Sequence, residues 1–263
     1  MRGRSGNRRE DMTDNDVPRI ALILAGGKGV RLRPITYRIP KPLVQINDKP
    51  VIDHIIEEAR RNGIHEFVIS VGYKANLIIK HLKKYSNKNP GIKISYLKEN
   101  PNTPLGTGGA IKFAFRAIRR RYNGDVLILN GDDLFTLDIA GMYLLHRKEK
   151  AMITVNIKEA KRRSDVANSG VVALRGNRIT KFVEKPALKE APSKLINMGK
   201  YIVNTEVYKY FPRRKVFFFE KEFLQGVVGK IKVCGYVSDG LWYPTDNPER
   251  LMRARTGWIR NGF

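Results

Sequence analysis

The segment that decides the fold is Ile20–Pro34, which reads IALILAGGKGVRLRP. Its first six residues are apolar and two glycines follow them directly, a pattern typical of a buried strand that ends in a loop. Three glycines within four positions let backbone N–H groups approach an anion closely. Lys28, Arg31 and Arg33 add positive charge to the same loop. The segment therefore predicts a buried strand followed by a seat for a polyanion.

Two common phosphate-binding motifs do not describe this loop. A P-loop would place Ser or Thr directly after Lys28, and a dinucleotide fingerprint would place a third glycine where Leu32 stands. A flexible basic turn would account for the glycines alone. The buried strand before them, and the arginines and proline after them, favour a binding function instead.

The first 157 residues alternate strand and helix patterns, and this alternation predicts an open, mostly parallel sheet with right-handed crossovers. The predicted strands are Ile20–Ala25, Phe67–Val71, Ile92–Leu97, Val126–Leu129 and Met152–Ile157. The predicted helices are Pro50–Asn62, Asn76–Tyr85, Gly108–Arg121 and a helix from Asp138 to Glu149.

The second half of the chain is richer in strands. Gly176-Asn177 between two short apolar runs predicts a hairpin. We expect a strand-rich lobe laid on the first sheet, within one domain of residues 18–263 whose halves are 18–157 and 158–263. Residues 1–17 are basic and polar and are expected to form a disordered tail. The predicted strands are Val171–Leu174, Arg178–Phe182, Met198–Val203 and Ile231–Tyr236, and the predicted helices are Glu222–Val228 and Pro248–Arg255.

Composition limits the classes of partner. The 263 residues carry a formal net charge of +25, which suits nucleic acid, a membrane surface or small anionic substrates. The basic clusters are scattered and not interleaved with aromatic residues, so we do not expect a nucleic-acid partner. No apolar run reaches eighteen residues, which predicts no membrane partner. The lone Cys234 cannot form an internal disulfide, which fits a cytoplasmic location.

Polar and charged residues follow the predicted strands at the edge where open α/β sheets bind ligands. Asp132 ends the most apolar strand, where a carboxylate can hold Mg²⁺, although Asp132 and Asp133 could also simply terminate the strand. Pro42 holds Lys41 extended, and a lysine near a phosphate seat can neutralise charge on a leaving group. Leu105–Ala110 places small residues at a helix start, where a ring or a ribose can pack, and Thr107 can cap that helix.

Two later segments carry further candidates. Glu184 could accept hydrogen bonds from sugar hydroxyls, and Lys185 could pair with a sugar phosphate. A surface ion pair is the simpler interpretation of these two residues. Asn197 offers an amide beside the close-approach residue Gly199.

Taken together, these motifs resemble the nucleotide-sugar pyrophosphorylases, the bacterial and archaeal sugar-1-phosphate nucleotidyltransferases. The resemblance spans residues 20–251 and is closest to the branch of mannose-1-phosphate guanylyltransferases and glucose-1-phosphate thymidylyltransferases. It implies a Rossmann-like three-layer α/β sandwich with a mostly parallel mixed sheet and a strand-rich sugar-binding lobe. The loop Leu24–Pro34 resembles the family signature, and five motifs follow in the family's order: Lys41-Pro42, Leu105–Ala110, Asn130–Asp132, Glu184–Pro186 and Asn197–Gly199.

The resemblance also implies substrates and roles. A nucleoside triphosphate and a sugar 1-phosphate would give a nucleotide sugar and pyrophosphate with Mg²⁺ as cofactor, and the likeness leans to GTP and mannose 1-phosphate. It implies that Arg31, Lys41 and Asp132 are catalytic, and that Asp132 binds metal. The sugar phosphate would contact Gly170, Glu184, Lys185 and Asn197. The nucleotide would contact Leu24, Ala25, Gly26, Gly27, Gly29, Arg31, Gly106, Thr107 and Gly109.

One segment departs from the family pattern. The family commonly has Trp-x-Asp-x-Gly-Thr-Pro-Glu, whose aspartate is the second Mg²⁺ ligand, whereas Trp242–Glu249 reads WYPTDNPE. Pro244 takes the aspartate position and Asp246 lies two residues later. Either Asp246 substitutes as a metal ligand, or the metal rests on Asp132 and the phosphates. Because of this proline, a non-catalytic nucleotide-sugar sensor stays an alternative function. The resemblance also leaves two alternatives open: thymidylyl or uridylyl transfer to glucose 1-phosphate, and assembly into a homo-oligomer.

Overall fold

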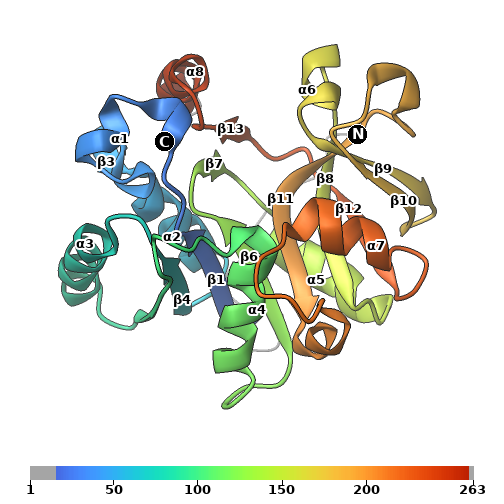
Figure 1. Ribbon diagram of the computed structural model, residues 1–263, viewed down its shortest axis with the longest axis horizontal. Helices are drawn as coiled ribbons and strands as arrows, with labels where there is room; N and C mark the ends of the chain where they lie inside the picture. The colour runs from blue at the N-terminus through green and yellow to red at the C-terminus, as the bar shows by residue number, and fades with distance from the viewer. Residues whose placement is uncertain (1–15, 261–263) are drawn as a thin grey trace, which may run out of the picture.

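A computed structural model describes residues 16–260 and has one nine-stranded sheet at its centre (Figure 1). The strand order is β5-β4-β1-β6-β11-β8-β12-β10-β9. In chain order the strands are β1 (Ile20–Ala25), β4 (Glu66–Val71), β5 (Lys93–Lys98), β6 (Asp125–Asn130), β8 (Ile153–Glu159), β9 (Gly170–Arg175), β10 (Arg178–Glu184), β11 (Leu195–Asn204) and β12 (Val233–Val237).

The first half of the chain forms the parallel part of the sheet, as its alternating pattern predicts. β1 pairs in parallel with β4 on one side and with β6 on the other, and Ile23 lies opposite both Ile69 and Leu129. These central strands are apolar along almost their whole length because helices cover both faces of the sheet. The carboxyl ends of β1 and β6 therefore meet at one edge, which is the edge where the glycine loop begins.

The second half continues the same sheet. β11 is antiparallel to both β6 and β8 and lies between them, and β12 pairs in parallel with β8. β9 and β10 form the predicted hairpin, with Gly176 at a positive φ of 58° in its turn. The sheet is thus mostly parallel and mixed, as expected. The expectation of a lobe laid on the first sheet is wrong, because the later strands extend the sheet edge to edge.

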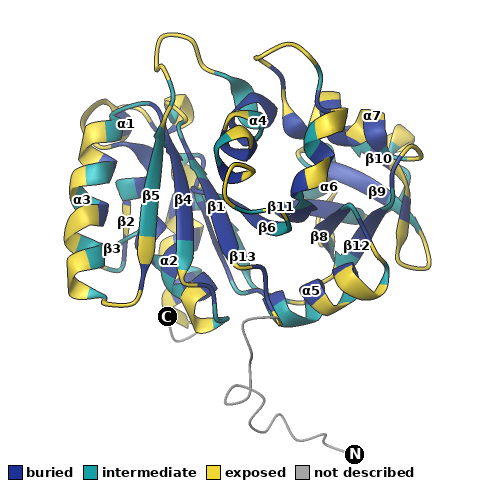
Figure 2. Ribbon diagram, turned by 90° about the horizontal axis from the view of Figure 1, so that it is seen from below, coloured by how far each residue is buried: buried dark blue, intermediate teal, exposed yellow. Residues whose placement is uncertain are grey.

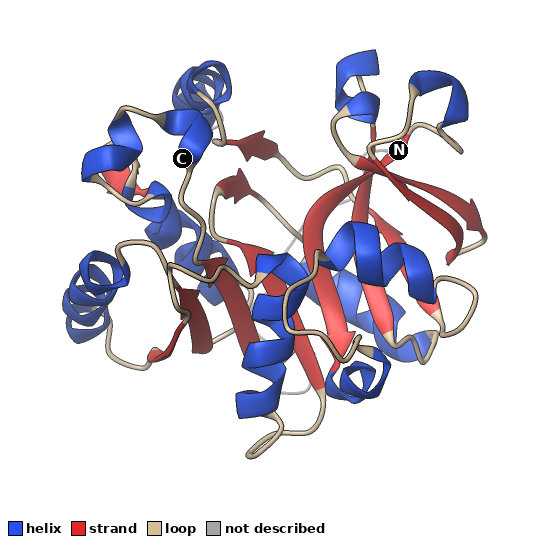
Figure 3. Cartoon of the chain, viewed as in Figure 1, coloured by secondary structure: helices blue, strands red, loops and turns tan. Residues whose placement is uncertain are grey.

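Helices cover both faces, which gives three layers (Figures 2 and 3). One apolar core joins Ala21 and Ile23 of β1 to α2, α3, α5 and α8, and the other joins Ile20 and Leu22 to α4 and the helical turns of residues 205–227. The helices are α2 (Val51–Arg61), α3 (Ala75–Lys88), α4 (Gly106–Ile118), α5 (Ile139–Lys148), α7 (Gln225–Val227) and α8 (Pro248–Arg260), with a 3-10 helix η4 (Thr205–Tyr210) and a π-helix η5 (Phe219–Leu224).

Short elements that the sequence patterns did not predict complete the site edge. β7 (Asp133–Phe135) pairs with β13 (Trp242–Pro244), so that Pro244 lies opposite Asp133. This pairing ties the C-terminal segment to the end of β6. The other short elements are η1 (Val30–Leu32), α1 (Ile35–Arg38), η2 (Lys41–Leu43), β2 (Gln45–Ile46), β3 (Lys49–Pro50), α6 (Arg163–Ala167) and η3 (Leu188–Glu190).

The predicted N-terminal tail, residues 1–17, falls mostly outside the described residues. Its last residue is an exception, because Val17 is buried in the same apolar core as Ala21 and Ile23. The tail prediction is therefore wrong at Val17, which belongs to the folded unit. No helix within residues 16–260 combines the length and the apolar character that crossing a membrane requires.

Candidate functional site

A pocket of about 430 Å³ opens at the carboxyl ends of β1 and β6. The pocket is lined by the glycine loop, the start of α4, the end of β6 and the C-terminal segment. We call the part that holds Lys41, Asp132 and Asp246 its floor. The lining residues of the pocket are Leu24, Ala25, Gly26, Gly27, Gly29, Val30, Arg31, Lys41, Pro42, Glu99, Pro104, Leu105, Gly106, Thr107, Ala110, Asn130, Gly131, Asp132, Phe218 and Asp246.

The glycine loop takes a shape that only small residues allow. Gly29 has a φ of 62°, in the left-handed region, and begins the single turn η1 that buries Leu32. A Cβ on Gly26 would lie 2.8 Å from the carboxylate of Glu99. Among the three cations of the loop only Arg31 lines the pocket, since Lys28 points to solvent and Arg33 lies over the ring of Tyr37.

Lys41 and Asp132 form an ion pair across the floor of the pocket. The turn η2 holds Lys41 with its side chain only 9% exposed, although lysine is ordinarily a solvent-facing residue. The carboxylate of Asp132 is 37% exposed and thus open to a ligand from the pocket side. A buried ammonium group beside the glycine loop is suited to bind phosphate oxygens.

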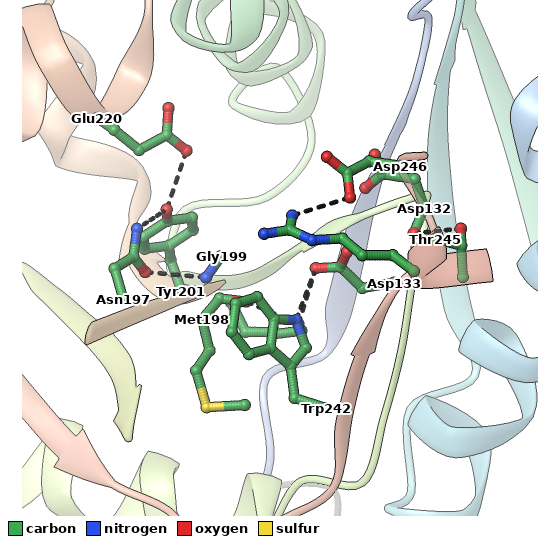
Figure 4. A network of polar contacts seen from close by, with 12 residues as sticks. Asp132, Asp133, Asn197, Met198, Gly199, Tyr201, Glu220, Trp242, Thr245 and Asp246 are labelled. Atoms are coloured by element: carbon green, nitrogen blue, oxygen red, sulfur yellow. Dashed lines mark hydrogen bonds and ion pairs between the residues drawn. The ribbon is translucent and has the colours of Figure 1, made fainter. Parts of the chain in front are cut away.

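Asp246 reaches the same floor from the C-terminal segment. Thr245 donates two hydrogen bonds to the backbone carbonyl of Asp132, from its N–H at 3.2 Å and its hydroxyl at 2.7 Å. Asp246 accepts ion pairs from Arg31 at 2.7 Å and Arg250 at 2.9 Å. Burial acts to raise the pKa of the Asp246 carboxyl, but the hydrogen bond and charge of Arg250 outweigh burial, and the pKa is lowered. Figure 4 shows Asp246 and Asp132 at one end of the network.

The donor set of this floor fits a hard divalent cation that keeps several ligands from its substrate. Asp132 and Asp246 supply carboxylate oxygens in one pocket, the ligands that Mg²⁺ prefers. Within residues 16–260 no group of three or more His, Cys, Asp or Glu side chains gathers to hold a metal. A cation here would therefore depend on phosphate oxygens for the rest of its coordination.

Glu99 stands at the other end of the pocket, just beyond β5. It accepts a hydrogen bond from the buried hydroxyl of Ser70 at 2.7 Å, and its backbone N–H donates to the carbonyl of Val71. Burial raises the pKa of the Glu99 carboxyl, while the hydrogen bond from Ser70 lowers it. A carboxylate in this position presents acceptors to any ring that packs on Leu105 and Gly106.

The start of α4 is tied to a second polar network. The hydroxyl of Thr107 donates to Glu220 Oε2 at 3.0 Å, and the hydroxyl of Tyr201 donates to Glu220 Oε1 at 2.9 Å. Asn197 Nδ2 in turn donates to the Tyr201 oxygen at 2.7 Å. Figure 4 shows Asn197, Tyr201 and Glu220 together on the side of the network opposite Asp246.

The candidate sugar-phosphate residues lie outside the pocket described above. Glu184 ends β10 beside Gly170, where a Cβ would lie 2.8 Å from its carboxylate. Burial and, less strongly, the charge of Glu220 raise the pKa of Glu184 to about 7, and its Oε2 is buried with no hydrogen-bond partner. Lys185 follows with a positive φ of 49°, and its N–H donates to the carbonyl of Ser169. Gly109 does not line the pocket either, and its N–H donates to the Phe217 carbonyl.

A buried ion pair near the site gave no signal in the sequence. Lys200 is fully buried in β11, and its Nζ donates to Asp133 Oδ2 at 3.1 Å and to the Met198 carbonyl at 2.7 Å. Trp242 Nε1 donates to the same carboxylate oxygen at 3.2 Å. Burial raises the pKa of Asp133 and lowers that of Lys200, because desolvation penalises both charges. The pair joins β11 to the β7–β13 ribbon.

A doubly covered, mostly parallel sheet with a cationic glycine loop at its carboxyl edge defines a Rossmann-like protein that binds a phosphorylated ligand. The chain belongs to the nucleotidyl transferase family, whose family model matches residues 20–257, and within it to the sugar-1-phosphate nucleotidyltransferases.

Named relatives agree with this assignment. The chain is 34% identical over 235 residues to a D-glycero-alpha-D-manno-heptose 1-phosphate guanylyltransferase of Aneurinibacillus thermoaerophilus, covering 89% of this chain and 96% of that one. It is 31% identical over 243 residues to the mannose-1-phosphate guanyltransferase of Saccharomyces cerevisiae, covering 91% of this chain and 64% of the yeast protein. The crystal structure of HddC from Yersinia pseudotuberculosis superposes with a TM-score of 0.74 at 28% identity, covering 92% of this chain and all of that one.

Proposed function

We propose that this protein is a guanylyltransferase that joins GTP to a sugar 1-phosphate of manno configuration, either mannose 1-phosphate or a manno-heptose 1-phosphate. The observation that carries the proposal is the meeting of Arg31, Lys41, Asp132 and Asp246 on one pocket floor beside the glycine loop. The named relatives support the choice of base and sugar, since both are guanylyl-transferring enzymes and both names specify a manno sugar.

The proposed reaction needs positioning and charge neutralisation more than proton transfer. A phosphate oxygen of the sugar 1-phosphate attacks the α-phosphorus of the triphosphate, and the bond to the leaving pyrophosphate breaks. The attacking oxygen is already anionic near neutral pH, because the second pKa of a phosphate monoester is about 6. No general base is therefore required, which agrees with a pocket that has no histidine among its lining residues within the described chain.

Arg31 and Lys41 are the proposed catalytic cations. Arg31 projects from the loop with a 70% exposed side chain, and the guanidinium donors that do not pair with Asp246 can bind phosphate oxygens. Lys41 lies on the floor. Asp132 and Asp246 are the proposed metal ligands, and a bound divalent cation would supply further positive charge to the phosphates. The two ion pairs seen on the floor hold these four side chains in place before substrates arrive.

Glu99 supports guanine as the base. An ionised carboxylate only accepts hydrogen bonds, and guanine offers two adjacent donors, N1–H and the N2 amino group, to a carboxylate in its plane. Uracil and thymine offer one donor between two carbonyl oxygens, which a carboxylate repels. We propose that Gly26, Gly27 and Gly29 receive the phosphates, while Leu24, Ala25, Gly106 and Thr107 pack against the ribose and base.

The sugar phosphate is proposed to bind on the side of Glu184 and Asn197. Glu184 has an oxygen without a partner at the end of β10, close to Gly170, and Lys185 follows as a cation. Residues 18–157 would thus carry the nucleotide side and residues 158–263 most of the sugar-phosphate side. Gly109 is proposed to act only through the packing of α4 on the segment around Phe217.

The proposal is tested by a matrix of GTP, UTP, dTTP, ATP and CTP against mannose, manno-heptose and glucose 1-phosphates. Pyrophosphate release and mass spectrometry of the nucleotide sugar identify productive pairs. We expect turnover with GTP and a manno sugar in the presence of Mg²⁺. Turnover only with UTP or dTTP and glucose 1-phosphate would replace the guanylyl assignment, and nucleotide-sugar binding without turnover would favour a sensor.

A further inference from the structure

Residues 212–220, the segment that follows η4, contact both sides of the site and have no role in the chemistry proposed above. Lys112 of α4 holds the beginning of this segment by donating to the carbonyls of residues 212, 213 and 214 at 2.6, 3.1 and 3.2 Å. The Phe217 carbonyl accepts the N–H groups of Gly108 and Gly109 at 3.0 and 3.2 Å. The segment is thereby fixed to the helix start that forms one wall of the nucleotide pocket.

Glu220 is the side chain through which this segment contacts both sides. One carboxylate oxygen accepts from Thr107, which lines the nucleotide pocket, and the other accepts from Tyr201 on β11. Thr107 also accepts from the N–H of Phe219 at 2.9 Å, so its hydroxyl has a defined direction. A single carboxylate therefore bridges α4 and β11.

The bridge also sets the orientation of a candidate sugar contact. Because an ionised carboxylate cannot donate, Tyr201 must donate to Glu220, and the Tyr201 oxygen is left to accept from Asn197 Nδ2. The Asn197 carbonyl oxygen accepts from the N–H of Gly199 at 2.9 Å. Tyr201 is 1% exposed and Asn197 8% exposed, so water does not offer substitute partners. Glu220, through Tyr201, and the N–H of Gly199 together fix the orientation of the Asn197 amide.

We propose that Glu220 is a positioning residue that couples the nucleotide side of the site, through Thr107, to the sugar-phosphate side, through Tyr201 and Asn197. The inference deepens the proposed function and rests on it. Glu220 acts on both substrates through other residues and transfers no proton.

The first test is Glu220→Gln, which keeps the side-chain volume but replaces one acceptor oxygen with a donor. We expect the KM for GTP and the KM for mannose 1-phosphate each to rise on the order of tenfold, with kcat changed far less. Thr107→Val should raise the KM for GTP most and, through Glu220, the KM for mannose 1-phosphate to a smaller extent, and Tyr201→Phe should do the reverse. Glu206→Gln is the matched control, because Glu206 is exposed and pairs only with Lys209 among the ion pairs of the described residues.

The second test measures the coupling itself. The effects of Thr107→Val and Tyr201→Phe should be non-additive when Glu220 is present and additive in a Glu220→Gln background. Additivity in both backgrounds, or a Glu220→Gln enzyme with a lower Tm but unchanged KM values, would overturn the proposal. If Glu220→Gln does not fold, the double mutant Thr107→Val/Tyr201→Phe decides alone, and additive effects there contradict the coupling.

Calorimetric titration with GTP and with mannose 1-phosphate separates this inference from the proposed function. If the wild-type protein binds both compounds but releases no pyrophosphate, the proposed catalysis fails while the coupling is still measured. Glu220→Gln should then weaken the binding of both compounds to a similar extent, whereas Thr107→Val weakens mainly the binding of GTP and Tyr201→Phe mainly that of mannose 1-phosphate. Unchanged affinities in Glu220→Gln would refute the coupling whatever the turnover result.

Discussion

The guanidinium of Arg31 lies 2.7 Å from the carboxylate of Asp246, an ion pair that joins the first loop of the chain to its last segment across the pocket. Thr245 fixes this position of Asp246 by binding the carbonyl of Asp132. The pair places a carboxylate near Asp132 even though Pro244 occupies the position that the family pattern gives to the second metal-binding aspartate. We therefore propose that Asp246, two residues later, takes the place of that aspartate.

Asp246→Asn should raise the Mg²⁺ concentration for half-maximal activity by about tenfold or more, because loss of even a residue that only orients a metal ligand typically weakens metal binding about 10- to 100-fold. Asp239→Asn is the control, since Asp239 is exposed and does not line the pocket. The measurement is a titration of pyrophosphate release with Mg²⁺ at saturating substrates. Equal Mg²⁺ requirements in both variants would leave the cation on Asp132 and phosphates alone.

Glu184→Gln should stabilise the ligand-free protein in a pH-dependent way. The pKa of Glu184 is raised from its ordinary 4.5 to about 7, so between these values the folded state binds more protons than the unfolded state. Stability from this group is therefore lost as pH rises from 4.5 to 7, and the glutamine removes that loss. Thermal unfolding should show a higher Tm for the variant at pH 8 and only about a quarter of this gain at pH 5.

The exposed Glu190→Gln is the control for that measurement, because it changes the same charge on the surface turn η3. The same Glu184→Gln enzyme should also have a raised KM for the sugar phosphate. A Tm gain that is equal at both pH values would show that Glu184 is not a carboxyl with a raised pKa.

Lys200→Met should destabilise the fold by about 3–5 kcal/mol, because it leaves Asp133 as a buried charge without its cation. Lys200→Met/Asp133→Asn should recover a large part of this loss, since the uncompensated charge is then gone. Urea denaturation of the single and double variants measures the difference. If the double variant loses as much free energy of unfolding as the two single variants lose together, the broken ion pair is not the cause.

Glu99→Gln should reduce the preference for GTP. The amide keeps one acceptor and introduces a donor that faces the donors of guanine, so kcat/KM for GTP should fall about 10- to 100-fold. Values for UTP and dTTP should change little, and Glu206→Gln should leave all of them unchanged. A uniform loss for every triphosphate would mean that Glu99 supports the pocket without reading the base.

The parallel half of the fold was predictable because its signals are local. Ile20–Ala25 matches β1 residue for residue, and Pro50 and Gly63 bracket α2 as start and stop residues do. The place of β11 was not predictable. Nothing in its own apolar pattern distinguishes an antiparallel strand inserted between β6 and β8 from a strand of a separate layer, since strand order depends on contacts distant in sequence.

The candidate site divides in the same way. Gly29, Arg31 and Asp132 lie in the loops that follow buried strands, so their place at the sheet edge could be inferred from sequence. Glu220 and Lys200 could not, because an acidic residue in FFFEKEF and a lysine within an apolar strand carry no local mark of their buried partners. The pairing of β7 with β13 could not be inferred either, because each strand has only three residues, too few to form a recognisable strand pattern.

The central claim is that Arg31 binds the nucleoside triphosphate in this pocket and neutralises its charge during nucleotidyl transfer. The most direct test compares initial rates of pyrophosphate release from GTP and mannose 1-phosphate for the wild type, Arg31→Ala and Lys28→Ala. Arg31 has a 70% exposed side chain, so its loss should leave Tm nearly unchanged. We predict that Arg31→Ala lowers kcat by about 100-fold or more while Lys28→Ala, whose lysine faces solvent outside the pocket, stays within a few-fold of wild type. Near-normal pyrophosphate release by Arg31→Ala would contradict the account.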